Sequence, residues 1–236
     1  MDRSETQQKV EYAIIQIEEK RDSASKRQLL AGGSDQGLRS QVTSGGHLDA
    51  LATLISDILV DAGLNEDEVF TSKREVILPG YFRPEKSWDI VAMHKGKLVA
   101  AIELKSIWSS YGNNMNNRTE EAVGSGFDLR TASKYNLYGD SVPWMGYVFV
   151  IRDDPKIHNP THFYEPHFPV DKAYEGTGYL GRSIATCKRL MIERVYDRVF
   201  YGMYDPVSKT VSEPSEDMSW AKFETALRGK VAEVLA

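Results

Sequence analysis

The sequence contains a single cysteine, Cys187. One thiol can form no disulfide within the chain and cannot build a cysteine-based zinc site, so both are excluded. Long apolar runs are also missing, because none approaches the ~20 residues that a membrane-spanning helix needs. The first residues, MDRSETQQKVEY, lack the apolar segment of a secretory signal. We therefore expect a protein of the reducing cytoplasm that has no membrane partner.

An excess of positive charge is absent as well. The chain has 29 lysines and arginines against 34 aspartates and glutamates, which gives a formal net charge of −5. This balance argues against a protein that coats nucleic acid, but carboxylates elsewhere can mask a local basic cleft. Internal repeats, low-complexity segments, a P-loop and a glycine-rich dinucleotide fingerprint are also missing, which argues against repeat proteins and the common nucleotide-binding classes.

The 236 residues, 41% of them hydrophobic, suffice for one large globular domain. We expect a single domain over residues 1–236 with an N-terminal helical extension of about residues 1–70. Apolar residues at helical spacing predict helices over 3–30, 47–62, 182–195 and 219–235. Apolar runs predict strands over 74–78 and 144–152 and a hairpin over 200–211. The expected fold class is α/β (α+β), a mixed central β-sheet flanked by helices.

The most informative stretch is SWDIVAMHKGKLVAAIELKS, which begins at Ser87. Two apolar, partly β-branched segments flank a polar turn at residues 95–97, which predicts two antiparallel strands. Three charged residues lie in or beside them: Asp89, Glu103 and Lys105. Because side chains alternate along a strand, Glu103 and Lys105 point to the same side, and the turn brings Asp89 back beside them.

Two carboxylates and one ammonium on an apolar platform suit metal-assisted phosphodiester hydrolysis. Asp89 and Glu103 would bind Mg²⁺ through oxygen ligands, and the metal would activate a water and neutralise charge on the phosphate. Lys105 can orient or deprotonate that water and stabilise the developing charge. We predict Asp89, Glu103 and Lys105 as catalytic residues, with Asp89 and Glu103 as metal ligands. The alternative is a surface hairpin with an ordinary Glu–Lys pair.

Two segments are candidates for DNA contact. Lys26 and Arg27 make the end of the first helix basic, next to a glycine-rich stretch at residues 31–37. Small residues allow close approach to a phosphate backbone, although a solvated helix face is the common reading of such charges. The second segment follows Lys105. We predict a loop over residues 113–118 that enters the major groove, with Glu120 or Glu121 in the turn after it, because Asn, Arg and Glu can pair with base edges. From Arg118 onward we predict a helix that Gly124 and Gly126 weaken. The candidates in this second segment are Asn113, Asn114, Asn116, Asn117, Arg118, Glu120 and Glu121, and an ordinary turn is the alternative.

The acid followed by an E-x-K pair resembles the PD-(D/E)xK nuclease superfamily, except that Trp88 stands where that superfamily usually has proline. A more specific resemblance covers most of the first 150 residues. It rests on SDQGLRSQVTSGGHLDAL from Ser34, EVILPGYFRPEKSWDIVA from Glu75, AIELKS from Ala101 and NNRTEEAVGSGFDLRTA from Asn116. Together these segments resemble the XhoI-type Type II restriction endonucleases.

The resemblance implies a restriction-endonuclease-like core with Asp89, Glu103 and Lys105 as its nuclease centre. It further implies a Mg²⁺-dependent enzyme that cuts double-stranded DNA at a palindrome, CTCGAG, with a cognate DNA methyltransferase as a functional rather than physical partner. A two-fold symmetric site is read most simply by a homodimer. The alternatives are a structure-specific repair or recombination nuclease of the same superfamily and a DNA-binding module whose nuclease centre is inactive.

Overall fold

The computed structural model describes residues 3–30, 45–72 and 74–236. Its centre is a six-stranded mixed sheet with the strand order β1-β4-β5-β6-β7-β8. These strands are β1 (Val69–Phe70), β4 (Ile90–His94), β5 (Lys97–Ile107), β6 (Trp144–Arg152), β7 (Arg198–Asp205) and β8 (Thr210–Ser212). A separate two-stranded ribbon pairs β2 (Ile77–Leu78) with β3 (Lys86–Ser87). The predicted fold class is confirmed.

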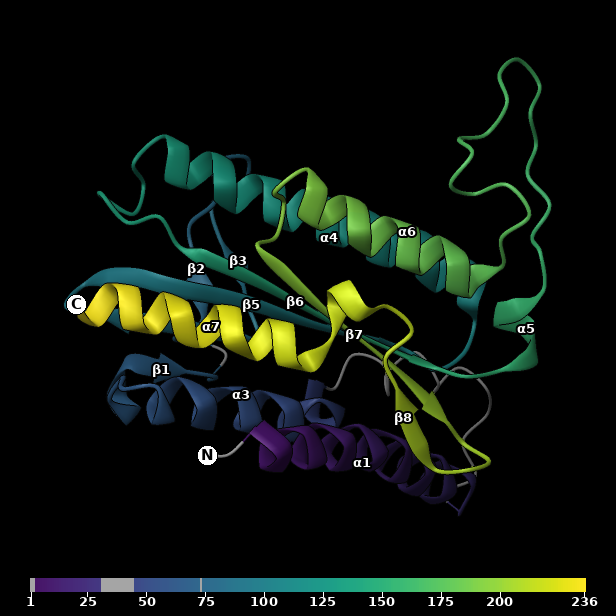
Figure 1. Cartoon of the computed structure of the whole chain (residues 1–236), viewed down its shortest axis with the longest axis horizontal. Helices are drawn as coiled ribbons and strands as arrows, with labels where there is room; N and C mark the ends of the chain where they lie inside the picture. Colours follow the sequence, from purple (N-terminus) through teal and green to yellow (C-terminus); the bar gives the residue numbers. More distant parts are fainter. Residues whose placement is uncertain (1–2, 31–44, 73) are drawn as a thin grey trace.

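Helices cover both faces of the sheet (Figure 1). One face carries α1 (Arg3–Leu30), α3 (Asp49–Asp61) and α7 (Trp220–Leu235), and the other carries α4 (Tyr111–Lys134) and α6 (Tyr179–Ile192). The short α5 (Pro155–His158) follows β6, and 3₁₀ turns lie at η2 (Gly45–His47), η3 (Glu66–Glu68) and η4 (Glu216–Met218). Among the described residues, no helix has both the length and the apolar character that crossing a membrane requires.

The predicted hairpin is β4 and β5, and β5 lies in the interior of the sheet. It pairs antiparallel with β4 and parallel with β6. Ile102 and Leu104 of β5 pack toward α1, α3 and α7, whereas Ala101 packs toward α4 and α6, so both faces of the strand are buried. Lys95 and Gly96 form the turn with φ of 48° and 75°. Two positive φ values match the twist of a two-residue hairpin, and glycine adopts them without strain.

Most other predicted elements lie where the sequence placed them. β6 has the predicted bounds, and α3 and α7 differ from prediction by one or two residues at their ends. The predicted strand over 74–78 is reduced to the two residues of β2, because residues 74–76 form a turn instead. The predicted helix over 182–195 is α6, shifted by three residues toward the N-terminus.

The loop predicted over residues 113–118 is wrong, whereas the helix predicted from Arg118 onward is confirmed. α4 begins at Tyr111 and continues through Gly124 and Gly126, two residues that weaken helix propensity. Packing explains Gly126, because a Cβ at this position would lie 2.5 Å from Cγ1 of Val195. The absence of a side chain therefore lets α4 approach the chain that follows α6.

Candidate active site

The structure brings the three predicted catalytic residues together. Asp89 lies in the bend before β4, where its N–H donates to the carbonyl of Ile102 (3.2 Å) and its Oδ2 accepts the N–H of Leu104 (2.6 Å). Glu103 and Lys105 lie two residues apart on β5, and Lys105 Nζ forms an ion pair with Glu103 Oε1. Strand alternation therefore produces one cluster of two carboxylates and an ammonium.

A second lysine, which no sequence pattern predicted, completes this cluster. Lys86 on β3 places its Nζ 2.5 Å from Oε2 of Glu103 and 4.3 Å from the centre of the Trp88 ring. The side chains of Lys86, Glu103 and Lys105 are 12%, 7% and 19% exposed, so water screens these ion pairs little. The pairing of β3 with β2 positions Lys86. Because a two-residue strand is too short to show a periodic pattern, the sequence contained no signal for this position.

Burial and neighbouring charges set the ionisation of the cluster. Burial, helped by the negative charge of Glu103, raises the pKa of Asp89 to about 6. Burial also acts to raise the pKa of Glu103, but Lys105 and Lys86 outweigh it and the net shift is downward. Burial acts to lower the pKa of Lys105, yet Glu103 and Asp89 raise it above its usual value. At neutral pH, Glu103 is therefore a carboxylate held between two ammonium groups.

The donor set of this cluster suits a hard divalent cation. Asp89 and Glu103 offer carboxylate oxygens, and Mg²⁺ is usually bound by one or two carboxylates together with waters and substrate phosphate. In the described part of the chain, no ion pair reaches Asp89, and no third His, Cys, Asp or Glu joins the two acids. The two residues therefore fit a site that waters and a DNA phosphate would complete.

Two buried tyrosines, which the sequence analysis did not predict as site residues, form one wall of the site. Tyr147 on β6 is the register partner of Glu103, and its ring lies 5.0 Å from that of Tyr196. Burial, followed by nearby negative charges that include Glu103, raises the pKa of Tyr196 well above its usual value. The Tyr196 hydroxyl is buried without a hydrogen-bond partner among the described residues. This wall is therefore apolar and neutral, with one unused polar group.

α4 contributes a further cation to the same side of the sheet. Arg118 lines a narrow crevice between α4 and α6 together with Tyr147, the register partner of Glu103. Its Nη1 pairs with Glu121 at 2.6 Å, whereas its buried Nε has no hydrogen-bond partner among the residues that the structure describes. The predicted loop that carries Arg118 into the major groove does not exist, because Arg118 lies within a helix that packs on the sheet.

Most of the other predicted DNA contacts lie on α4. The exposed ones on α4 are Asn113, Asn116, Asn117, Glu120 and Glu121. Asn114 is half-buried and donates to a backbone carbonyl (2.7 Å), and Asn116 accepts from Arg182 of α6 (3.1 Å). Because residues three and four apart on a helix share a face, the five exposed side chains lie along one side of α4. Lys26 and Arg27 fall at the end of α1, and their side chains lie outside the described residues.

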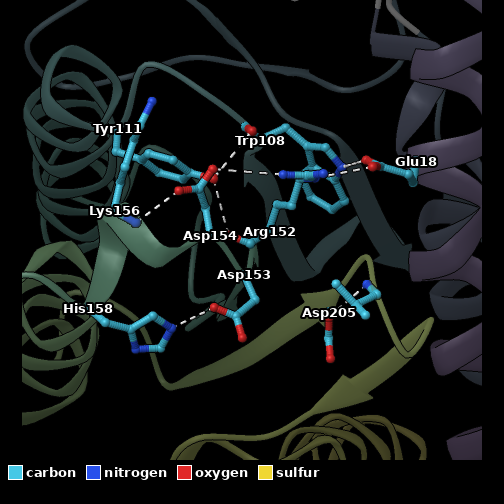
Figure 2. Close-up of polar contacts among 10 residues, drawn as sticks. Glu18, Trp108, Tyr111, Arg152, Asp153, Asp154, Lys156, His158 and Asp205 are labelled. Atoms are coloured by element: carbon cyan, nitrogen blue, oxygen red, sulfur yellow. Dashed lines mark hydrogen bonds and ion pairs between the residues drawn. The ribbon is translucent and has the colours of Figure 1, made fainter.

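A polar junction fixes the ends of β5 and β6 beside the start of α4 (Figure 2). Glu18 of α1 accepts the indole N–H of Trp108 and pairs with Arg152 Nε at 3.1 Å. The Tyr111 hydroxyl, at the first turn of α4, donates to the carbonyl of Arg152 at 3.3 Å. Because these contacts tie α1, both strands and α4 together, they also fix the position from which Arg118 projects.

The chain resembles known proteins over most of its length. The family model described as restriction endonuclease XhoI matches residues 27–205, a region that contains the whole charged cluster. The chain is 35% identical over 212 residues to the Type II restriction enzyme BstVI of Geobacillus stearothermophilus, which covers 86% of this chain and 94% of that protein. It is 39% identical over 163 residues to the Type II restriction enzyme XhoI of Xanthomonas vasicola, which covers 68% of this chain and 66% of that protein. The Type II restriction enzyme AbrI of Azospirillum brasilense is 35% identical over 164 residues, with 69% and 73% covered. No solved structure matches the chain.

Proposed function

Because this chain belongs to the XhoI family of restriction endonucleases, we propose that it cuts double-stranded DNA at the palindrome CTCGAG in a reaction that requires Mg²⁺. Family membership makes the chain a Type II restriction endonuclease, which hydrolyses phosphodiester bonds at specific sites. The convergence of Asp89, Glu103 and Lys105 carries the proposed catalytic centre. The hexamer and the metal are what the resemblance to the family implies.

Each side chain of the proposed centre has a role that its surroundings support. Asp89 and Glu103 would hold Mg²⁺, which when bound supplies an activated water and a counter-charge for the scissile phosphate. Burial acts to lower the pKa of Lys105, but the carboxylates of Glu103 and Asp89 outweigh it, so the pKa is raised. Lys105 is therefore a hydrogen-bond donor that orients the attacking water and balances charge on the phosphate, rather than a base.

A plasmid digest tests this specificity. With Mg²⁺ and a plasmid that carries a known number of CTCGAG sites, discrete fragments that end at those sites are expected, and none in EDTA. Discrete fragments with other ends would assign a different palindrome. A smear, or cleavage of branched DNA alone, would favour a structure-specific nuclease, and binding without cleavage would favour an inactive nuclease centre.

The same proposal includes protection of the host chromosome. We expect a cognate DNA methyltransferase that modifies the recognition site in the cytoplasm and does not bind the nuclease. Plasmid methylated within the site should resist cleavage, whereas unmodified plasmid from another strain should be cut. Co-purification of a methyltransferase in a stable complex would contradict this part of the proposal.

A homodimer would place one catalytic centre on each strand of a palindrome. An exposed row of four rings supports this assembly, since apolar patches of this kind mark protein interfaces. The row is Tyr135, Tyr81, Phe82 and Phe127, which are between 45% and 64% exposed and contact one another in this order with ring centroids 4.7 to 5.9 Å apart. Tyr81 and Phe82 meet edge to face, and the other two pairs stack. At 150–250 Å² per ring, the row offers roughly 400 Å², about half of the ~800 Å² that each partner buries in a standard interface. The rings are uncharged, although Lys134 Nζ lies 5.9 Å from the centre of the Tyr135 ring, and a mainly apolar surface suits a second copy of this chain better than a phosphate backbone.

Sedimentation at micromolar concentration is therefore expected to give about twice the 26.6 kDa mass of the chain. Phe127→Asp should weaken the dimer at least ~30-fold, the effect of losing one interface hot spot. The matched control is Phe168→Asp, because Phe168 is an 83% exposed phenylalanine outside the row. A wild-type chain that stays monomeric, both free and on a cognate duplex, would exclude the dimer. A dimer unaffected by Phe127→Asp would exclude this surface only.

A further inference from the structure

Both carboxylate oxygens of Glu103 are engaged by ammonium groups. Oε1 contacts Lys105, and Oε2 lies 2.5 Å from Lys86 Nζ. Glu103 is buried, so these contacts are not chance encounters of mobile surface side chains. A divalent cation that shares an oxygen with an ammonium is repelled by it at short range, and the repulsion is strong where water is excluded. Metal binding at Glu103 therefore favours the departure of one ammonium group.

Lys86 is the ammonium group that can leave more easily. Lys105 belongs to β5, which is paired on both sides, whereas Lys86 belongs to the two-residue β3, which pairs only with β2. Lys86 Nζ also lies 3.0 Å from the carbonyl of Ser87 and over the Trp88 ring at 4.3 Å. A carbonyl and an aromatic face both attract a cation, so Lys86 retains partners when Glu103 turns to a metal.

α4 holds the loop that carries Lys86. Asp128 of α4 is 2% exposed and accepts the N–H groups of Tyr81 and Phe82 at 2.8 and 2.7 Å. The same carboxylate pairs with Arg83 Nε at 3.1 Å. Three contacts to one buried acid fix the backbone a few residues before Lys86, so the lysine is delivered to a defined place in the cluster.

We propose that Lys86 is an internal counter-ion, which neutralises Glu103 in the metal-free enzyme and competes with the divalent cation for that carboxylate. This inference rests on the metal site of the proposed function. It follows that the enzyme binds Mg²⁺ weakly without DNA. A phosphate of bound DNA attracts Lys86 away from Glu103, so the binding of DNA and of metal reinforce each other.

The test is the affinity of the DNA-free enzyme for Mg²⁺ and for Ca²⁺, measured by titration calorimetry on three proteins. Lys86→Met removes the charge and keeps an apolar stem that can pack against Trp88. Lys97→Met is the matched control, because Lys97 is an exposed lysine at the start of β5 and its loss changes net charge equally. Lys86→Met should bind both ions at least ~10-fold more tightly, since a neighbouring unit charge in a shielded site has at least this effect. Lys97→Met should bind them as the wild type does.

A second readout and a second variant separate the possible failures. In EDTA the melting temperature of Lys86→Met should fall below that of the wild type, and Mg²⁺ should raise it by a larger increment. Lys86→Arg keeps the charge and should bind Mg²⁺ no more tightly than the wild type. Equal affinities for Lys86→Met and Lys97→Met, or tighter binding by Lys86→Arg, would overturn the inference. If the wild type and Glu103→Gln bind Mg²⁺ alike, the metal site of the proposed function is itself wrong, and Lys86 has no cation to compete with.

Discussion

Glu103→Gln is expected to lower the rate of DNA cleavage at least ~10²-fold, the low end for loss of an electrostatic catalytic group. Glutamine keeps the shape of the side chain and removes the negative charge on which Lys86 and Lys105 converge and to which the proposed metal would bind. Alanine is less informative, because it also removes both oxygen acceptors from the two ammonium groups and leaves a cavity. The measurement is the single-turnover rate on a duplex with one site at saturating enzyme. Asp89→Asn should act in the same direction.

The control for this experiment is Glu75→Gln. Glu75 precedes the same hairpin but is exposed in the turn before β2, so its variant should cut at the wild-type rate. Binding of Glu103→Gln to the cognate duplex should persist in Ca²⁺, because most of that affinity comes from contacts elsewhere on the DNA. Cleavage by Glu103→Gln at the normal rate would show that the catalytic centre lies elsewhere.

The central hairpin could be predicted because its chemistry is local. β4 and β5 are apolar runs joined by a two-residue turn, and side-chain alternation alone brings Glu103 and Lys105 to one side. The antiparallel pairing then brings Asp89 to the N–H of Leu104. Residues whose proximity follows from the geometry of one hairpin can be read from their spacing.

The residues that escaped prediction depend on contacts between distant segments. Lys86 reaches Glu103 from the separate ribbon of β2 and β3, 17 residues earlier in the chain. α4 was mistaken for a loop at its start because asparagine and glycine are frequent there. Its sparse apolar stripe, formed by Tyr111, Met115, Ala122 and Leu129, packs on the sheet and overrides weak propensity. Four apolar residues in a helix of 24 give a weak periodic signal in the sequence. Their spacing of about one or two helical turns is nevertheless the pattern that could have predicted the helix.

Arg118→Ala is expected to lower the cleavage rate ~10²-fold. It should also weaken binding to the cognate duplex and to an unrelated duplex, and the two affinities should fall by equal factors. Arg118 lies beside Tyr147 on the catalytic face, and its Nε is buried without a hydrogen-bond partner among the described residues. The Arg118 side chain is 18% exposed, so the outer edge of its guanidinium group suits a phosphate oxygen near the cut bond. Removing a donor that stabilises developing charge costs ~10²–10³-fold in rate. Contact with phosphate is independent of base sequence, which is why both affinities should fall together.

Two further variants make the role of Arg118 specific. Arg118→Lys keeps the charge but not the fork of donors, so it should restore affinity for both duplexes more fully than it restores cleavage. Lys188→Ala, on an exposed position of α6, should leave cleavage unchanged and serve as the matched loss of one positive charge. Each protein is measured on cognate and scrambled duplexes at two salt concentrations. If Arg118→Ala weakens binding to the cognate duplex alone, the residue reads a base. In that case α4 must reorient on DNA, because the Arg118 side chain faces the sheet and would have to enter a groove.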